Sequence, residues 1–223
     1  FGPYKAYLQR VYGLELEVDT FEKSTVPQDA DALISLGGDG TMLEAMLVVG
    51  SSGIPMLGFN LGRLGFLSPI SREVFKDALT ALAKRAYSLE KRSLLMAEVA
   101  GKGLGEQAYA LNEITVMKKD TASMVEIRCY LNEEFFNTYR ADGLIISTPT
   151  GSTGYGLSCG GPIVHPACPT ITLTPIAPHN LTQRPFVIPD HASIRLEAYS
   201  RNKEYLVSLD SRSYSLNECT ALS

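Results

Sequence analysis

The chain has 223 residues, of which 45% are hydrophobic and 20% are charged, and its net charge is −4 at pH 7. This composition is typical of a globular protein that can bury a full core, and the negative balance gives no electrostatic footprint for nucleic acid. No run approaches the ~18 consecutive apolar residues of a membrane span, and no secretory signal pattern opens the sequence. The four cysteines form no C-x-x-C pair. We therefore expect reduced thiols in a cytoplasmic protein, with neither nucleic acid nor membrane as a partner.

The first part of the chain alternates helical and strand patterns. Residues Tyr4 to Val11 have a helical pattern and Leu14 to Val18 a short strand pattern. The compact apolar run from Asp31 to Leu36 predicts a buried strand. A glycine-rich loop follows, then a buried helix from Thr41 to Val49 and a further strand pattern, IPMLGFN, from Ile54 to Asn60.

The clearest helical pattern is SREVFKDALTALAKRAY, from Ser71 to Tyr87, which carries an apolar stripe at helical spacing. Ser71 is the expected N-cap, and Glu73 suits the positive end of the helix dipole. The order strand, helix, strand, helix predicts a parallel α/β sheet of the Rossmann type.

After about Leu89 the pattern changes to alternating strands. In MVEIRCYL, from Met124 to Leu131, apolar and polar residues alternate, and the segment from Ser193 to Leu209 predicts a hairpin with a polar turn. We therefore predict an α/β lobe over residues 1–88 and a mainly antiparallel β lobe over residues 89–223. A cleft between two such lobes is a natural ligand site.

The glycine-rich loop GGDG has the composition of an anion-binding turn. Gly37, Gly38 and Gly40 allow positive φ and close approach of a ligand to the main chain, and the amides that open the helix at Thr41 attract phosphate. Asp39 cannot bind phosphate oxygens without repulsion, so it would take a proton from an attacking hydroxyl or hold Mg²⁺. The alternative is a tight turn in which Asp39 is only a helix N-cap. We assign no residue as a direct metal ligand.

Two adjacent polar residues, Asn112 and Glu113, interrupt the strand pattern YALNEITVM. Burying an unpaired carboxylate costs on the order of several kcal/mol. Either the strand meets a cleft here, or Glu113 has a hidden cation, or the pair simply lies at a strand end in water. Both side chains suit recognition of hydroxyl groups.

The segment from Ser147 to Gly161 interleaves five glycines with hydroxyl side chains and has neither helical nor strand period. Neutral donors and acceptors beside exposed backbone suit a base and a ribose, and Tyr155 could stack on a purine. Arg140 and Asp142 precede the segment, one able to pair with an anion and the other with an amide. The alternative is a flexible loop of turn residues.

These segments, in this order, resemble the NAD kinase family. The resemblance rests on LGGDGTML at Leu36 to Leu43, GxLGFL within Gly62 to Leu67, Asn112–Glu113, and DGLIISTPTGSTGY at Asp142 to Tyr155. It continues through SCGGPIVHP and LTPIAPHNL…RP, so that it runs from about Asp31 to Phe186. The GGDG motif alone also occurs in diacylglycerol-type lipid kinases and phosphofructokinases, whereas its combination with the other segments is specific.

The resemblance implies transfer of the ATP γ-phosphoryl group to the 2′-hydroxyl of the adenosine ribose of NAD, giving NADP, with Mg²⁺ or another divalent cation. It implies that Asp39 is the base and that Gly37, Gly38, Gly40 and Thr41 form the phosphate loop. It further implies a set of dinucleotide-binding residues. Asn112 and Glu113 would hold ribose and adenine groups, Asp142 the nicotinamide amide with Arg140 close by, and Phe66 would cover part of the nicotinamide side. Thr153, Gly154, Tyr155 and Ser158 would line the adenine pocket, and Ala177 would touch the dinucleotide.

The resemblance also implies homo-dimers or tetramers, and it leaves two rival functions to exclude: a lipid kinase and a non-catalytic dinucleotide sensor. The family often has alanine at the position of Gly154 and a larger residue at Gly156. We expect the family's first strand and its C-terminal return to the first lobe to lie outside this sequence. Asp210 to Arg212 stands where a polar binding position sometimes occurs and is left unassigned.

Overall fold

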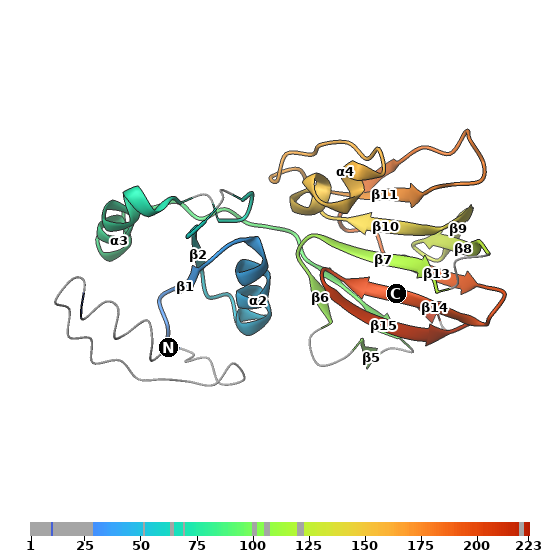
Figure 1. Ribbon diagram of the computed structural model, residues 1–223, viewed down its shortest axis with the longest axis horizontal. Coiled ribbons are helices and arrows are strands. Elements are labelled where there is room, and N and C mark those ends of the chain that lie inside the picture. Colours follow the sequence, from blue (N-terminus) through green and yellow to red (C-terminus); the bar gives the residue numbers. More distant parts are fainter. Residues whose placement is uncertain are drawn as a thin grey trace.

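The computed structural model describes residues 10, 29–50, 52–62, 65–68, 70–99, 102–104, 108–119, 123–218 and 221–223. The predicted strand from Leu14 to Val18 lies outside these residues, as does the predicted helix from Tyr4 to Val11, apart from Arg10, which is helical. Figure 1 shows two lobes side by side, joined by an extended segment.

The first lobe is built on two parallel strands. β1 (Leu33–Leu36) pairs with β2 (Met56–Phe59), and α2 (Asp39–Val49) connects them and lies against both (Figure 1). This is the parallel α/β arrangement that the sequence predicted, with a helix as the crossover connection. The helix begins two residues earlier than predicted, so it includes Asp39 and Gly40.

The predicted long helix after β2 is shorter than expected. A 3-10 turn, η1 (Arg72–Val74), precedes α3 (Phe75–Ala83), and the chain leaves the helix through Arg85, which has a φ of 53°. The prediction of Ser71 as the N-cap is wrong, because the first turn tightens into the 3-10 form and Val74 takes the N-cap position of the α-helix. Phe75 packs on Phe59 of β2, with ring centroids 4.5 Å apart.

Residues 86–94 contain neither helix nor strand. The predicted lobe boundary between residues 88 and 89 falls inside this stretch and stays a prediction.

The second lobe is a β sandwich of two mainly antiparallel sheets (Figure 1). One sheet has the order β12-β11-β10-β7-β14-β15, and we call it the site sheet; the other has the order β5-β4-β16-β13-β8-β9, and we call it the outer sheet. A small separate sheet pairs β3 with β6. The strand bounds are β3 (Leu95–Met96), β4 (Glu98–Val99), β5 (Lys102–Gly103), β6 (Tyr109–Ala110), β7 (Glu113–Lys118), β8 (Val125–Leu131), β9 (Glu134–Ala141), β10 (Gly143–Ser147), β11 (Thr170–Ile176), β12 (Phe186–Pro189), β13 (Ile194–Tyr199), β14 (Glu204–Leu209), β15 (Arg212–Asn217) and β16 (Ala221–Leu222).

The hydrophobic core lies between the two sheets. In β8 the predicted alternation is confirmed, because Val125, Ile127 and Cys129 are fully buried while the residues between them are not. Burial raises the pKa of the Cys129 thiol to about 12, so this thiol stays protonated and unreactive near neutral pH. Cys159 and Cys168 are also free thiols.

The predicted hairpin from Ser193 to Leu209 is wrong. Its two strands exist, but β13 pairs with β8 and β16 in the outer sheet, whereas β14 pairs with β7 and β15 in the site sheet. Ser200 stabilises the crossing, since its hydroxyl donates to the carbonyl of Glu204 at 2.7 Å and accepts from the Glu204 amide at 3.1 Å. Alternation of apolar and polar residues predicts which face of each strand is buried. Because the inner faces of both sheets pack in one core, the same pattern fits two strands in different sheets as well as two strands of a hairpin.

No helix in the described part of the chain is long and apolar enough to cross a membrane.

Candidate functional site

The GGDG loop leaves its backbone open at the start of α2. Gly38 is the N-cap, with φ −94° and ψ −167°, and no side chain caps the helix. The prediction of positive φ is wrong for Gly37, Gly38 and Gly40, because none of them takes such a value. Glycine is required sterically at position 37, because a Cβ there would overlap the Thr41 side chain. At Gly38 and Gly40 an added Cβ would have no atom within 4 Å, so the space in front of the loop is open. The uncapped amides and the helix dipole therefore remain accessible to an anion.

Asp39 does not cap the helix, so the N-cap alternative is wrong. Its carboxylate instead accepts hydrogen bonds from the backbone amides of Phe66 and Leu67, one on each oxygen and each at 3.0 Å. Gly65 is required for this approach, because a Cβ there would overlap the carboxylate. These contacts fix the orientation of the acid, and they place it beside Phe66, whose side chain is 73% exposed.

Asn112 and Glu113 lie at a break in the chain rather than inside one strand. Leu111 and Asn112 form a bend between β6 and β7, which belong to different sheets, and Glu113 is the first residue of β7. The strand pattern is therefore interrupted because the chain changes sheets here.

Asp210, which the sequence left unassigned, holds this bend in place. It lies in the turn between β14 and β15 with a φ of 50°. One carboxylate oxygen accepts from the amides of Asn112 at 2.8 Å and Glu113 at 3.2 Å, and the other accepts from the amide of Leu111 at 3.0 Å. The Asp210 amide donates in return to the carbonyl of Glu113 at 3.0 Å. The only sequence signal for this role is an acidic residue in a two-residue turn.

Glu113 is a half-buried carboxyl group with an unusual environment. Its Oε2 atom is buried and has no hydrogen-bond partner among the described residues. Burial, and then the negative charge of Asp210, raise the pKa of Glu113 from 4.5 to about 7. Within the described part of the chain no cation acts on Glu113, as the hidden-cation alternative requires; the charge that acts on it there is the carboxylate of Asp210.

The hydroxyl-rich segment has regular structure although its sequence has neither helical nor strand period, and the flexible-loop alternative is wrong. After β10 it forms a 3-10 turn, η2 (Thr150–Thr153), and a single helical turn, α4 (Tyr155–Ser158). The Thr148 hydroxyl donates to the carbonyl of Leu111 at 2.6 Å and accepts from the amide of Gly151 at 3.1 Å.

This segment packs tightly on the Asn112 bend. The Thr148 amide donates to the Asn112 carbonyl at 2.9 Å. A Cβ at Gly151 would overlap the Asn112 backbone, and one at Gly154 would lie 2.9 Å from Glu113 Oε2. Glycine at these two positions therefore allows the segments to meet.

The remaining predicted pocket residues of this segment face outward from it. Tyr155 is 39% exposed, Ser158 is exposed and Thr153 is half-buried. Burial and the neighbouring Cys159 raise the pKa of Tyr155, so its phenol stays neutral. A cation that the sequence did not single out lies beside this segment, since Arg92, in the stretch 86–94 between the lobes, donates to Thr150 Oγ1 at 3.2 Å.

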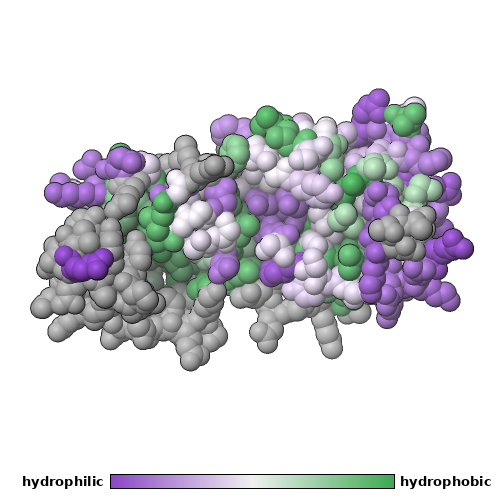
Figure 2. Space-filling view, viewed as in Figure 1, coloured by the Kyte–Doolittle hydropathy of each residue, from purple (hydrophilic) through white to green (hydrophobic). Residues whose placement is uncertain are grey.

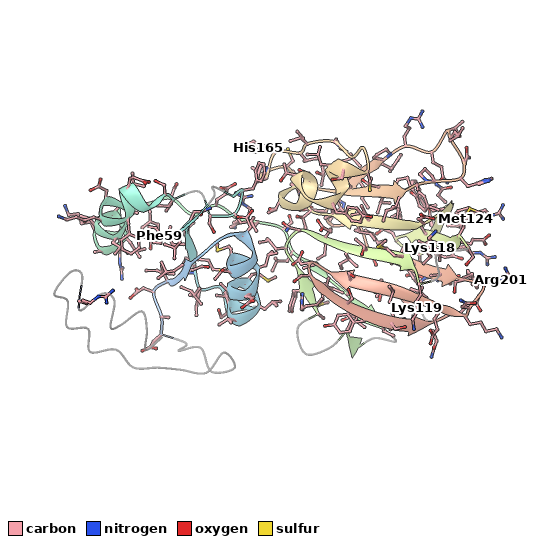
Figure 3. The ribbon with its side chains drawn as sticks, viewed as in Figure 1. Phe59, Lys118, Lys119, Met124, His165 and Arg201 are labelled. Carbon is pink, nitrogen blue, oxygen red and sulfur yellow. The ribbon has the colours of Figure 1, made fainter. Side chains whose placement is uncertain are left out.

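Asp142 and Ala177 lie at the other end of β10. Glu113 pairs with Ser147, whereas Met117 pairs with Gly143. The two ends are therefore about 13 Å apart along the strand. The Asp142 carboxylate forms an ion pair with Lys118 at 2.7 Å, and Figure 3 shows Lys118 at the end of the β lobe away from the α/β lobe. Hydrophilic side chains gather at that end (Figure 2). Ala177 is exposed and takes a φ of 44°, which is unusual for a residue with a side chain.

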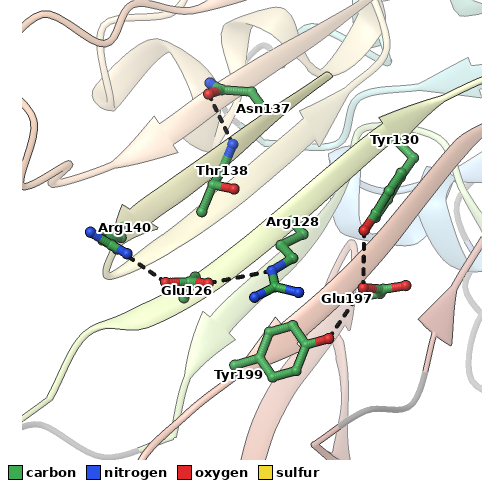
Figure 4. A network of polar contacts seen from close by, with 8 residues as sticks. All are labelled: Glu126, Arg128, Tyr130, Asn137, Thr138, Arg140, Glu197 and Tyr199. Carbon is green, nitrogen blue, oxygen red and sulfur yellow. Dashed lines mark hydrogen bonds and ion pairs between the residues drawn. The ribbon is translucent and has the colours of Figure 1, made fainter. Parts of the chain in front are cut away.

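Arg140 lies on the outer sheet. It forms an ion pair with Glu126 at 3.0 Å within a polar network on that sheet (Figure 4). With His179 and Gln183 it lines a polar surface pocket of about 510 Å³. The structure therefore brings Asn112, Glu113 and the Thr153–Ser158 segment together, and separates Arg140 from them.

Chemically, the α/β lobe offers an open helix start for phosphate and one oriented acid. The near end of the site sheet offers a mainly neutral surface of glycine backbone, hydroxyls and one raised-pKa carboxyl. Such a surface suits a sugar and a base better than a phosphate.

Comparisons with known proteins agree with this arrangement. Residues 9–87 match the ATP-NAD kinase N-terminal domain, and residues 111–218 match the ATP-NAD kinase C-terminal domain. The NAD kinase of Flavobacterium psychrophilum is 51% identical over 200 residues, which are 87% of this chain and 68% of that protein. The NAD kinase of Flavobacterium johnsoniae is 48% identical over 212 residues, which are 92% of this chain and 72% of that protein.

Two solved structures share the fold. Yeast NADH kinase complexed with NADH has a TM-score of 0.77 and 30% identity, covering 88% of this chain and 60% of that chain. An NAD kinase from Archaeoglobus fulgidus in complex with ATP has a TM-score of 0.77 and 27% identity, covering 100% of this chain and 84% of that chain. On the family matches and the identity to curated relatives, the chain belongs to the ATP-NAD kinase family.

Proposed function

We propose that the protein transfers the γ-phosphoryl group of ATP to the 2′-hydroxyl of the adenosine ribose of NAD, producing NADP. The proposal rests on family membership and on one structural observation: the open start of α2 carries a single acid, Asp39, whose carboxylate is oriented by two backbone amides. Family relatives support this kinase activity, and no described feature favours a lipid kinase or a non-catalytic sensor.

In this proposal Asp39 accepts the proton of the ribose hydroxyl as the hydroxyl attacks. Each carboxylate oxygen has two lone pairs, and the amides of Phe66 and Leu67 use one on each oxygen. One lone pair per oxygen therefore remains for the hydroxyl proton. The backbone of Gly37, Gly38, Gly40 and Thr41 would hold the ATP phosphates at the helix start.

The remaining predicted residues would bind the dinucleotide. Asn112 and Glu113 would bind ribose and adenine groups, and Thr153, Gly154, Tyr155 and Ser158 would line the adenine pocket. At the far end of β10, Asp142 would meet the nicotinamide amide, with Arg140 of the outer sheet close by, and Ala177 would touch the dinucleotide. Phe66, beside Asp39 in the α/β lobe, would cover part of the nicotinamide side. The position of Glu113 at one end of β10 and of Asp142 at the other supports an elongated ligand.

A divalent cation such as Mg²⁺ fits this site as a companion of the nucleotide. The described residues contain no cluster of three or more His, Cys, Asp or Glu side chains that could form a cage, and Mg²⁺ is commonly bound through one or two carboxylates together with substrate phosphates and water. Asp39 is the carboxylate of the glycine loop that could contribute. When bound, the cation would neutralise charge on the phosphates.

We further propose that the protein forms homo-dimers or tetramers in the cytoplasm. The free thiols support a reducing location. The proposal of assembly rests on family membership, and shared sites would place Asp142 of one copy at the Glu113 end of another. Sedimentation at several concentrations tests the assembly, and mixing Asp142→Asn with Glu113→Gln chains tests whether activity returns when sites are shared.

The decisive experiment mixes protein, NAD, ATP and Mg²⁺ and detects the product with a strictly NADP-dependent dehydrogenase. A parallel reaction with NADH as acceptor tests the reduced substrate. The matched control is Asp77→Asn on the exposed side of α3, which should keep full activity while Asp39→Asn loses it. If the protein binds NAD but forms no NADP under any of these conditions, the proposed activity is wrong.

A further inference from the structure

The turn between β14 and β15 contacts the proposed dinucleotide site from the side opposite the hydroxyl-rich segment. Asp210 holds the amides of Leu111, Asn112 and Glu113, and its own amide donates to the Glu113 carbonyl. Arg212, the first residue of β15, donates to the carbonyl of Tyr109 in β6. The turn therefore holds the bend between β6 and β7, and the strand that follows the turn holds the end of β6.

We propose that Asp210 is a positioning residue of the dinucleotide site: its carboxylate fixes the backbone bend that presents the Asn112 and Glu113 side chains to the substrate. The inference rests on the proposed function for the identity of that substrate. Its physical basis is that an ionised carboxylate accepting several backbone amides forms strong, charge-assisted hydrogen bonds. The left-handed backbone of Asp210, rare for a residue with a side chain, adds a local constraint at the same place.

The same carboxylate also acts on the charge state of Glu113. Among the groups around Glu113, Asp210 supplies the negative charge that, after burial, raises its pKa to about 7. Ser147, which pairs with Glu113 across β7 and β10, is a neutral hydroxyl. The η2–α4 segment itself carries no charged residue, and the cation that contacts it is Arg92, on Thr150. Tyr155 on that segment stays neutral because its pKa is raised. Near neutral pH a large fraction of Glu113 is therefore protonated, and its carboxyl can donate a hydrogen bond as well as accept one.

Two variants separate the position of Asp210 from its charge. Asp210→Asn keeps an acceptor for Asn112 and Glu113 but removes the charge, whereas Asp210→Glu keeps the charge but moves it by one methylene. The control is Asp190→Asn, whose carboxylate accepts only from Ser93 at the surface, at 3.3 Å, among the bonds of the described residues. Thermal unfolding confirms that each variant is folded.

The first measurement is a carbon-13 NMR titration of glutamate carboxyls in the full chain without ligand, with Glu113 assigned by the signal missing in Glu113→Gln. We expect the Glu113 midpoint to fall by up to roughly one pH unit in Asp210→Asn, since burial is the larger cause of the raised pKa, to stay raised in Asp210→Glu and to be unchanged in Asp190→Asn. An unchanged midpoint in Asp210→Asn, or an equal shift in the control, overturns the link between Asp210 and Glu113.

The second measurement is NAD binding by calorimetry between pH 5.5 and 8.5. We expect both Asp210 variants to bind NAD roughly tenfold or more weakly, with the pH dependence altered only in Asp210→Asn. A uniform loss at every pH in both variants indicates a merely structural role and overturns the proposal, as does unchanged binding. If the wild-type protein fails to bind NAD, the proposed function is wrong, while the titration still decides whether Asp210 controls Glu113.

Discussion

The raised pKa of Glu113 predicts a pH-dependent stability that the variant Glu113→Gln should remove. In the folded protein the pKa of Glu113 is about 7, whereas the ordinary pKa of a glutamate side chain is 4.5. The folded state therefore binds more protons than the unfolded chain between these values. The contribution of protonated Glu113 to the free energy of unfolding is therefore complete below pH 4.5 and is lost as the pH rises through 7.

The magnitude follows from the size of the shift. The full change in the pKa of Glu113 from 4.5 to about 7 is worth about 3.4 kcal/mol, at about 1.36 kcal/mol for each pKa unit. Roughly 2.5 kcal/mol of this falls between pH 5 and pH 8, because Glu113 of the unfolded chain is already mostly ionised at pH 5. Glu113 is only partly buried, so solvent screening reduces this to about 1–2 kcal/mol. Glutamine does not titrate, so any fixed cost of the substitution cancels when the two pH values are compared.

The assay is urea unfolding of the wild-type and Glu113→Gln proteins at pH 5 and pH 8. We expect the wild-type protein to lose about 1–2 kcal/mol more unfolding free energy than the variant over this range. The matched control is Glu134→Gln at the exposed start of β9, which should follow the wild-type curve. If the difference between wild type and Glu113→Gln does not change with pH, Glu113 is an ordinary carboxyl and our account of its burial beside Asp210 is refuted.

Three further substitutions test the loops around the site. Asp39→Asn should keep the fold and NAD binding but lower kcat by about 10²–10⁴-fold, and near-full kcat would remove Asp39 from the role of base. Gly65→Ala should lower kcat toward the same value with NAD affinity little changed, because the new Cβ overlaps the Asp39 carboxylate and forces it to turn; an unchanged kcat in a rapid kinetic assay argues against this positioning. Gly151→Ala should destabilise the protein by about 2–3 kcal/mol, because its Cβ overlaps the Asn112 backbone, which cannot yield as a side chain can. Urea unfolding measures this loss against Gly62→Ala, where a Cβ has open space, and equal midpoints for the two variants would contradict the overlap.

Much of the architecture could be predicted because local sequence patterns indicate the type and order of its helices and strands. The alternation in β8 buries a face that periodicity alone identifies. The apolar run predicted a buried strand at β1; the strand is confirmed, but its buried residue is Ser35 and Ile34 is 39% exposed. The order of elements likewise predicted the parallel α/β lobe and the antiparallel β lobe, both of which are confirmed. The GGDG loop, the Asn112–Glu113 pair and the hydroxyl-rich segment stood out because their residue types conflict with the strand patterns beside them.

The tertiary structure decided what depends on contacts between distant residues. Asp210 is 97 to 99 residues from the amides it holds, and Asp39 is 27 and 28 residues from the amides that orient it. The crossing of β13 and β14 between sheets and the position of Arg140 on the outer sheet have the same origin. An alternating strand records which of its faces is buried, but not which neighbour buries it. The sequence by itself therefore determined the two lobes and the motifs of the candidate site, whereas only the packed fold determined which backbone groups hold Asp39 and Glu113, because hydrogen bonds across such separations leave no local pattern.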